Sequence, residues 1–398
     1  MPAEQTKMEQ AGQDMLYLVN CAIHGSVPEN RERLKGMDIE SVYKFSKFHS
    51  LSAITYMALE PVRDFLLECG NNANGILDKW QEDKDKAVRK NILLDGARFE
   101  IFQFMEERGI WYMPLKGIRM KELYPKIGMR QMADNDILYD KAYQDEVKVY
   151  MESKGYETVS FKKFHHDVYE KPPVYNFELH TSLHNASYKK DWFAYYSNVK
   201  ERLIKDEGNK YGYHFSNEDF YIYMITHTYK HFDGGGTGVR SLLDIFVFLN
   251  KMEESDVKFD REYVREELAQ LDLVTFEQRF VSLARQVFEK EEIVAKDLEP
   301  LLFDCMYSGT YGTLQRSVQK KLKEIQADDE QISLKTRLKY YGKRLFLSME
   351  YYKEHCPLLY KYKILIPFHS LYRCIRGLLF ARKRIWRECV TIWQAGKK

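Results

Sequence analysis

Residues 109–190 constrain the fold more than any other part of the chain, because they interrupt a sequence that otherwise predicts helices. Short apolar and aromatic runs of this kind are typical of buried strands. They predict strands over 110–115, 134–139, 156–161, 166–170 and 174–180. A helix is expected over 143–153. This stretch is therefore expected to form an α/β unit of roughly eighty residues.

On both sides of this unit, apolar residues recur every three or four positions, which predicts amphipathic helices. One such region is 14–68, and a long helix is expected over about 77–108, ending at Gly109. Beyond Tyr188, further helices are expected over 219–231, 239–252, 260–271, 275–288 and 318–325. The α/β unit thus lies between two helical regions.

The composition indicates a globular protein of more than one domain. With 398 residues, of which 44% are hydrophobic, the chain can bury a sizeable core. The cysteines show no Cys-x-x-Cys pairing, so neither a zinc site nor a disulfide framework is indicated. No run approaches the roughly 18 to 20 uninterrupted apolar residues of a membrane span, and residues 1–13 are polar. We therefore expect no transmembrane segment and a cytoplasmic location.

Positive charge is concentrated at the C-terminal end. Lys335–Lys398 holds 16 Lys and Arg against three acidic residues, a local net charge of +13 in a chain whose total is +2. The remainder must therefore carry −11. A basic tail on an acidic body suggests an intramolecular clamp, an anionic partner such as a membrane or a nucleic acid, or a lid over a phosphate-bearing ligand.

Three carboxylates are predicted to gather on one face of the sheet. Asp134 and Asp136 are two positions apart, so a strand would point both side chains to the same face. Glu178 lies between Phe177 and Leu179, which would face the core. Carboxylates crowded in this way repel one another unless a cation neutralises them, and oxygen ligands suit Mg²⁺. This chemistry serves phosphoryl or nucleotidyl transfer, although a polar turn would equally explain an Asp-Asn-Asp stretch taken alone.

Two cations lie close to the acidic strand in the sequence. Lys116 follows the first predicted strand, and Arg130 precedes Asp134 by four positions. A cation at either position would clamp a phosphate group or neutralise Asp134 in the absence of a ligand.

A second basic group lies in the helical region that follows. Lys230, His231 and Arg240 are expected to face the α/β unit and to bind phosphates from the opposite side. A helix cap at 234–236 explains the same stretch without any ligand.

The same region also contains a second set of potential metal ligands. His227 and His231 have the i, i+4 spacing of zinc peptidases, but Thr228 stands where such enzymes carry their glutamate base. A metal hydrolase built around His227, His231 and Asp244 is therefore the lesser alternative.

Several short motifs follow one another along the chain. They are Leu115-Lys116-Gly117, Arg130, Asp134-Asn135-Asp136-Ile137-Leu138, Glu178-Leu179-His180, His227-Thr228-Tyr229-Lys230-His231, Gly236-Thr237-Gly238-Val239-Arg240-Ser241-Leu242-Leu243-Asp244, and a proline-punctuated segment from His355 to Arg373. This ordered set resembles the uncharacterised bacterial nucleotidyltransferase-like proteins of the DNA polymerase beta superfamily. The resemblance covers roughly residues 90 to 385.

The resemblance implies an α+β fold, in which a small mixed β-sheet forms a nucleotidyltransferase core embedded between N-terminal and C-terminal helical regions. We expect four parts: an N-terminal helical region over 1–108, the core over 109–190, a helical domain over 191–330 and a basic, aromatic-rich helical tail over 331–398.

The resemblance also implies roles for the site residues. Asp134 and Asp136 would hold two Mg²⁺ ions, and Glu178 would be a third carboxylate that binds the catalytic metal and helps to deprotonate the acceptor hydroxyl. Well-studied members carry Gly-Ser after the first strand, where this chain has Lys116-Gly117. Lysine can still bind phosphate as a point charge, and glycine still permits close backbone approach.

The sequence therefore predicts a Mg²⁺-dependent nucleotidyltransferase. It would move a nucleoside monophosphate from a nucleoside triphosphate to a hydroxyl-bearing acceptor, which is a small molecule, a peptide or protein, or an RNA end, and would release pyrophosphate. The alternative is a degenerate relative that binds a nucleotide or a partner without catalysis, with the basic tail as its interaction surface.

Overall fold

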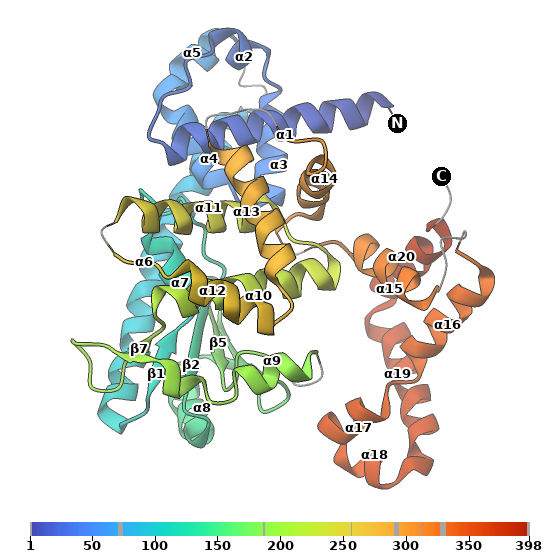
Figure 1. Cartoon of the computed structure of the whole chain (residues 1–398). Helices are drawn as coiled ribbons and strands as arrows, with labels where there is room; N and C mark the ends of the chain where they lie inside the picture. Colours follow the sequence, from blue (N-terminus) through green and yellow to red (C-terminus); the bar gives the residue numbers. More distant parts are fainter. Residues whose placement is uncertain are drawn as a thin grey trace. The chain divides into compact units, whose positions relative to one another are not determined.

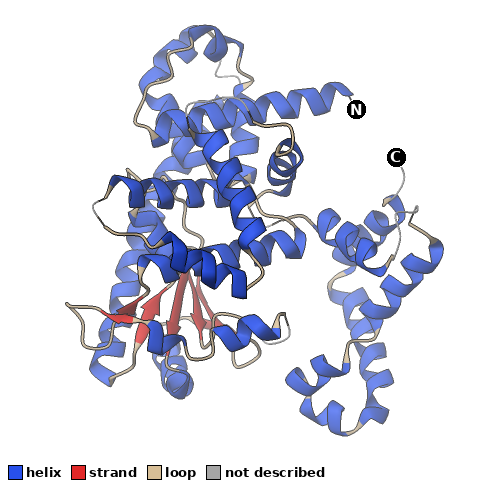
Figure 2. Ribbon diagram, in the orientation of Figure 1, coloured by secondary structure: helices blue, strands red, loops and turns tan. Residues whose placement is uncertain are grey.

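Helices surround one small sheet in the computed structural model, which describes residues 2–70, 75–185, 188–255, 257–289, 294–310, 312–326 and 332–395 (Figures 1 and 2). Internal contacts divide the chain into two compact units. Unit 1 comprises Met1–Tyr229 and Gly238–Thr310, and unit 2 comprises Lys230–Thr237 and Tyr311–Lys398. The expected α+β class is confirmed, whereas the four-part division by sequence stays a prediction.

Unit 1 begins with a group of helices, drawn from blue to cyan in Figure 1. They are α1 (Pro2–Ile23), α2 (Arg31–Gly36), α3 (Ile39–Phe48), α4 (Ser52–Leu59), η1 (Glu60–Val62), α5 (Arg63–Glu68) and α6 (Ile76–Arg108). Helix α1 packs against α3 and α4, and α4 packs against α6. Gly109 ends α6 with a left-handed backbone (φ 71°), which confirms the expected helix end.

The strands of the α/β unit form a five-stranded mixed sheet in the order β1-β2-β5-β4-β3. They are β1 (Tyr112–Pro114), β2 (Asn135–Tyr139), β3 (Glu157–Ser160), β4 (His166–Lys171) and β5 (Tyr175–His180). Strands β2 and β5 run parallel, and the other neighbouring pairs are antiparallel. All five lie where the apolar runs predicted strands, and the sheet is mixed as expected.

One face of the sheet is covered by apolar side chains from helices. Helix α6 and helix α8 (Gln144–Ser153) supply Leu94, Ile101, Val147 and Met151, which share one buried core with Ile137, Tyr139, Phe177 and Leu179 of β2 and β5. Because side chains alternate between the two faces of a strand, this burial turns Asp136 and Glu178 to the other face. The core therefore orients the candidate site.

The rest of unit 1 is mainly helical. It contains α7 (Lys116–Glu122), η3 (Lys141–Tyr143), α9 (Lys190–Tyr195), η4 (Val199–Arg202), β6 (Ile204–Lys205), β7 (Tyr213–His214), most of α10 (Asn217–Gly235), α11 (Val239–Glu254), α12 (Arg261–Gln270), α13 (Val274–Phe288) and α14 (Glu299–Ser308). Helices α10 to α13 lie where the apolar periodicity predicted them. Sequence analysis missed α9, α14 and the two-residue strands β6 and β7. Elements as short as α9, β6 and β7 carry little periodicity.

Unit 2 is helical. It contains the last turn of α10 with α15 (Leu314–Ile325), α16 (Leu334–Leu345), α17 (Met349–His355), α18 (Pro357–Lys361), η5 (Lys363–Leu365), α19 (Ile366–Phe380) and α20 (Arg382–Gln394). A small core of Val318, Leu322, Tyr340 and Ile392 joins α15, α16 and α20. Among the described helices, no single one is long and apolar enough to cross a membrane, but 363–380 and 385–394, bent by 99°, pass that test as a pair.

Candidate active site

The parallel pairing of β2 with β5 brings two of the predicted carboxylates side by side. Asp136 is the direct partner of Glu178 in the ladder, and both side chains are partly exposed on the face opposite the core. The side-chain oxygens of Asp136 and Glu178 lie within 4.8 Å of each other and of a ring nitrogen of His180. The structure thus gathers two oxygen donors and one nitrogen donor at one point on the sheet.

Asp134 lies next to this pair but just outside the strand. Strand β2 begins at Asn135, whose buried amide donates to the Leu94 carbonyl oxygen at 2.9 Å, so the prediction that Asp134 belongs to the strand is wrong by one residue. Burial, and then the charge of Asp136, raise the pKa of Asp134 to about 6. Burial and the charges of Asp136 and Asp134 also raise the pKa of Glu178. The three carboxylates therefore act on one another electrostatically.

Histidines from β4 and β5 border the carboxylates. His180 Nε2 lies 3.1 Å from Asp136 Oδ1, and His166 Nε2 lies 3.7 Å from Glu178 Oε2. His166 pairs with His180 across the antiparallel β4–β5 hairpin. Sequence analysis missed His165 and His166, although a hairpin centred on Pro173 would have placed His166 opposite His180.

Two further residues near the carboxylates come from distant helices. Tyr223 of α10 is buried, and burial together with the charges of Asp136 and Glu178 raises its pKa well above the ordinary value. Lys90 of α6 donates to the Ala133 carbonyl oxygen at 2.7 Å, and its charge lowers the pKa of Asp134. Sequence analysis missed both, because no local pattern links positions this far apart.

Lys116 and Arg130 make a buried ion cluster with Asp244 of α11. Arg130 donates to both carboxylate oxygens of Asp244, at 2.8 Å from Nε and 3.0 Å from Nη2, and Lys116 Nζ lies 3.3 Å from Oδ2. Tyr124 also donates to this carboxylate, at 2.9 Å. Burial would raise the pKa of Asp244, but Arg130 and Lys116 hold it well below its ordinary value. Burial lowers the pKa of Lys116 to about 8.

This cluster changes the interpretation of the two cations. Sequence analysis expected Lys116 and Arg130 to clamp phosphate or to neutralise Asp134, but their direct carboxylate partner is Asp244. The same contacts occupy the carboxylate on which the metal-hydrolase alternative depended. Among the described residues, the potential metal-ligand groups comprise Asp136, Glu178 and His180, and His165, His166 and His180, and they do not include His227, His231 or Asp244.

The remaining predicted nucleotide-binding residues differ in their placement. Gly117 begins α7 with Lys116, and its carbonyl oxygen accepts from Arg130 Nη1 at 3.1 Å. Arg240 donates to the Gln131 carbonyl oxygen at 2.7 Å, and its charge lowers the pKa of Asp134. Lys230 and His231 belong to unit 2, so their contact with phosphate stays a prediction.

The donor set fits a hard divalent cation. Asp136 and Glu178 offer oxygen atoms from adjacent strands, and burial, followed by the repulsion between neighbouring carboxylates, raises the pKa values of Asp134 and Glu178. A divalent cation relieves this repulsion and takes carboxylate oxygens as ligands. Asp136 and Glu178 would hold the ion, and Asp134 lies close enough to act on it.

Comparison with known proteins supplies one match. A family model described as an uncharacterised nucleotidyltransferase matches residues 35–289. This range contains the whole five-stranded sheet and the helices α10 to α13. No curated protein and no solved structure matches the chain.

Replacing Asp134 with Asn should stabilise the protein at pH 8 in EDTA-containing buffer. The carboxyl ionises near 3.8 in the unfolded chain but at about 6 in the folded one, so its charge opposes folding above pH 6. We expect a gain of about 1–2 kcal/mol in unfolding free energy, discounted for partial exposure, which disappears as pH falls from 6 towards 4. Urea unfolding of wild type and the variant across this pH range measures the gain. Equal unfolding free energies of the two proteins at pH 8 would show that the charge of Asp134 does not oppose folding.

Replacing Asp244 with Asn should destabilise the protein strongly. The change leaves Lys116 and Arg130 buried without their counter-charge, which costs on the order of 3–5 kcal/mol. Asp145→Asn is the matched control, because Asp145 is exposed and pairs only at the surface with Lys162. Urea unfolding measures both variants, and a similar small effect for the two would show that the buried cluster contributes little.

Proposed function

The chain belongs to the uncharacterised nucleotidyltransferase family, and from this premise we propose that it is a Mg²⁺-dependent enzyme that transfers a nucleoside monophosphate. The donor is a nucleoside triphosphate and the leaving group is pyrophosphate. The observation that carries the proposal furthest is the ladder pairing of Asp136 with Glu178, with Asp134 adjacent. Two Mg²⁺ ions are proposed for these carboxylates.

Each residue of the site has a proposed role. Asp136 and Glu178 would ligate the ions, and Asp134 would complete the oxygen set. Bound there, Mg²⁺ would neutralise triphosphate charge and lower the pKa of the acceptor hydroxyl. His180, 3.1 Å from Asp136 Oδ1, holds that carboxylate in one orientation. Glu178, whose pKa burial and neighbouring charge raise, is suited to receive the hydroxyl proton.

The cationic side chains of unit 1 are proposed to have two different roles, one in binding phosphate and one in holding the turn at Gly117. Arg240 and Lys90, whose charges act on Asp134, would meet the triphosphate, with Lys230 and His231 as further candidates. Lys116 and Arg130, engaged with Asp244, would instead fix the turn at Gly117. Leu115 at that turn donates its N–H to the Asp136 carbonyl oxygen at 2.9 Å, so this turn borders the metal-binding strand.

A degenerate relative that binds a nucleotide without catalysis is the second candidate. The observation that favours it is the burial of Lys116 on Asp244, because the residue that stands where well-studied members carry glycine does not offer its charge to phosphate. The enzyme hypothesis requires a hydroxyl-bearing acceptor, which is a small molecule, a peptide or protein, or an RNA end. We propose a cytoplasmic location, where nucleoside triphosphates are abundant.

Isothermal titration of each ribonucleoside triphosphate, with and without Mg²⁺, tests the proposal. Wild type should bind one of them in a Mg²⁺-dependent manner, and the Asp134→Asn, Asp136→Asn double variant should lose at least about tenfold in affinity. Binding should weaken below pH 6, where Asp134 gains a proton. Asp145→Asn, an exposed carboxylate of α8, is the matched control and should bind as wild type does.

Two outcomes would count against the proposal. If wild type binds none of the nucleotides, the protein does not use a nucleoside triphosphate. If the double variant binds as tightly as wild type, Asp134 and Asp136 are not part of the binding site. Pyrophosphate release in the presence of candidate acceptors then separates transfer from the non-catalytic alternative.

A further inference from the structure

Three histidines converge beside the carboxylates, and two of them, His165 and His166, have no role in the proposed transfer. Ring nitrogens of His165, His166 and His180 lie within 4.8 Å of one another. The ring centroids of His166 are 4.6 Å from His165 and 5.0 Å from His180, and those of His165 and His180 are 5.6 Å apart. The hairpin register holds them together, because His166 is the first residue of β4 and pairs with His180.

The donor chemistry of this trio differs from that of Mg²⁺. Imidazole nitrogen suits zinc, cobalt and nickel, whereas Mg²⁺ prefers oxygen. Glu178 Oε2 lies 3.7 Å from His166 Nε2 and 3.9 Å from His180 Nε2, so this carboxylate borders the three histidines. Three imidazole nitrogens match the ligand set of a zinc site that keeps its fourth position for water or a substrate.

We propose that His165, His166 and His180 bind a divalent transition-metal ion of the zinc class. The site joins the start of β4 to the end of β5 and would place a fixed positive charge beside the carboxylates. It does not rest on nucleotidyl transfer, because two of its ligands, His165 and His166, have no role in the proposed reaction.

Titration of the full chain with Co²⁺, followed by visible absorption, tests this site. Wild type should bind one equivalent with the absorption of a nitrogen-rich tetrahedral site, and Zn²⁺ should displace it. A His165→Ala, His166→Ala double variant should bind at least about tenfold more weakly. His214→Ala is the matched control, since His214 pairs with Asp206 on another sheet.

The results separate this site from the transfer function. Weakened Co²⁺ binding with unchanged Mg²⁺-nucleotide binding in the double variant supports a distinct metal site. Equal Co²⁺ affinity in wild type and the double variant, or no tetrahedral absorption in wild type, overturns it and leaves a metal-free histidine cluster. Circular dichroism of all variants shows whether each one is folded. The milder His166→Gln variant repeats the test if the double variant does not fold.

An independent observation concerns unit 2, where helix α19 exposes one large apolar surface. Phe368, Leu371, Leu379 and Phe380 are 69%, 60%, 67% and 83% exposed. Contiguous apolar surface on a soluble domain marks a binding face. Trp386 of α20 is exposed as well.

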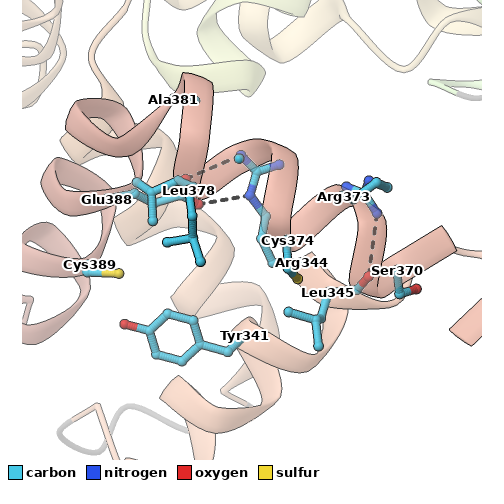
Figure 3. Close-up of a pocket in the computed structure, with 12 residues that line it drawn as sticks. Tyr341, Arg344, Leu345, Ser370, Arg373, Cys374, Leu378, Ala381, Glu388 and Cys389 are labelled. Carbon is cyan, nitrogen blue, oxygen red and sulfur yellow. Dashed lines mark hydrogen bonds and ion pairs between the residues drawn. The ribbon is translucent and has the colours of Figure 1, made fainter. Parts of the chain in front are cut away.

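A cavity of about 570 Å³ opens between α16, α19 and α20, and Figure 3 shows the residues that line it. Its apolar lining includes Leu345, Leu378 and Ile385, and arginines stand among these side chains. Arg344 Nε lies 3.0 Å from Glu388 Oε1, and Arg373 Nη1 donates to the Leu345 carbonyl oxygen at 3.4 Å. The cavity therefore offers an apolar interior beside cationic groups.

We propose that unit 2 binds the surface of an anionic lipid bilayer, with α19 lying in the plane of the interface. The tail carries a net charge of +13, which complements anionic headgroups, and its exposed aromatic and aliphatic side chains suit the boundary with the acyl chains. The 99° bend between 363–380 and 385–394 suits helices that lie in the interface.

Vesicle flotation of the full chain tests the bilayer proposal. Wild type should float with vesicles of phosphatidylcholine and phosphatidylglycerol, and poorly with phosphatidylcholine alone. A Leu379→Glu, Phe380→Glu variant and an Arg373→Gln, Arg376→Gln variant should each bind about tenfold more weakly. Phe99→Glu is the matched control, because Phe99 is 62% exposed on α6 of unit 1.

Several results would overturn it. Equal flotation of wild type and both variants would show that neither feature binds lipid. Absence of flotation together with a dimer that Leu379→Glu, Phe380→Glu disrupts would assign the face to a second copy of the chain. If wild type binds single-stranded RNA and not vesicles, the basic tail binds nucleic acid instead of lipid.

Discussion

The pairing of β2 with β5 is the interaction on which the candidate site depends. Ile137 and Tyr139 of β2, with Phe177 and Leu179 of β5, are fully buried against α6 and α8. Because side chains alternate along a strand, Glu178 and the other residues between these buried ones must lie on the opposite face of the sheet. A slip of one residue in this register would bury a carboxylate and expose a phenylalanine, so hydrophobic packing on one face positions charge on the other.

Repulsion among the carboxylates of the candidate site lowers the stability of the folded protein, and packing elsewhere in unit 1 must offset this loss. Burial, and then neighbouring charge, raise the pKa values of Asp134 and Glu178, so both carboxyl groups keep their protons to a higher pH than free carboxyl groups do. Arg240 and Lys90 offset part of this repulsion, because their charges lower the pKa of Asp134, and each also donates to a backbone carbonyl oxygen.

Local sequence pattern predicted the elements well and the long-range contacts poorly. The end of α6 at Gly109, the five strands and the shared face of Asp136 and Glu178 follow from periodicity and burial, which are properties of short segments. The engagement of Lys116 with Asp244 and the approach of Tyr223 to the carboxylates depend on how distant helices dock. Such docking is decided by packing over the whole unit, so no spacing in the sequence indicates it.

The Asp244 cluster also bears on how the protein is made. Arg130 lies 114 positions before its carboxylate, and Lys116 lies further away still. A chain emerging from the ribosome therefore carries two cations at the turn before β2 well before the carboxylate of α11 exists. The buried ion cluster can form only once α11 has been synthesised, so the final setting of this turn depends on a segment made much later.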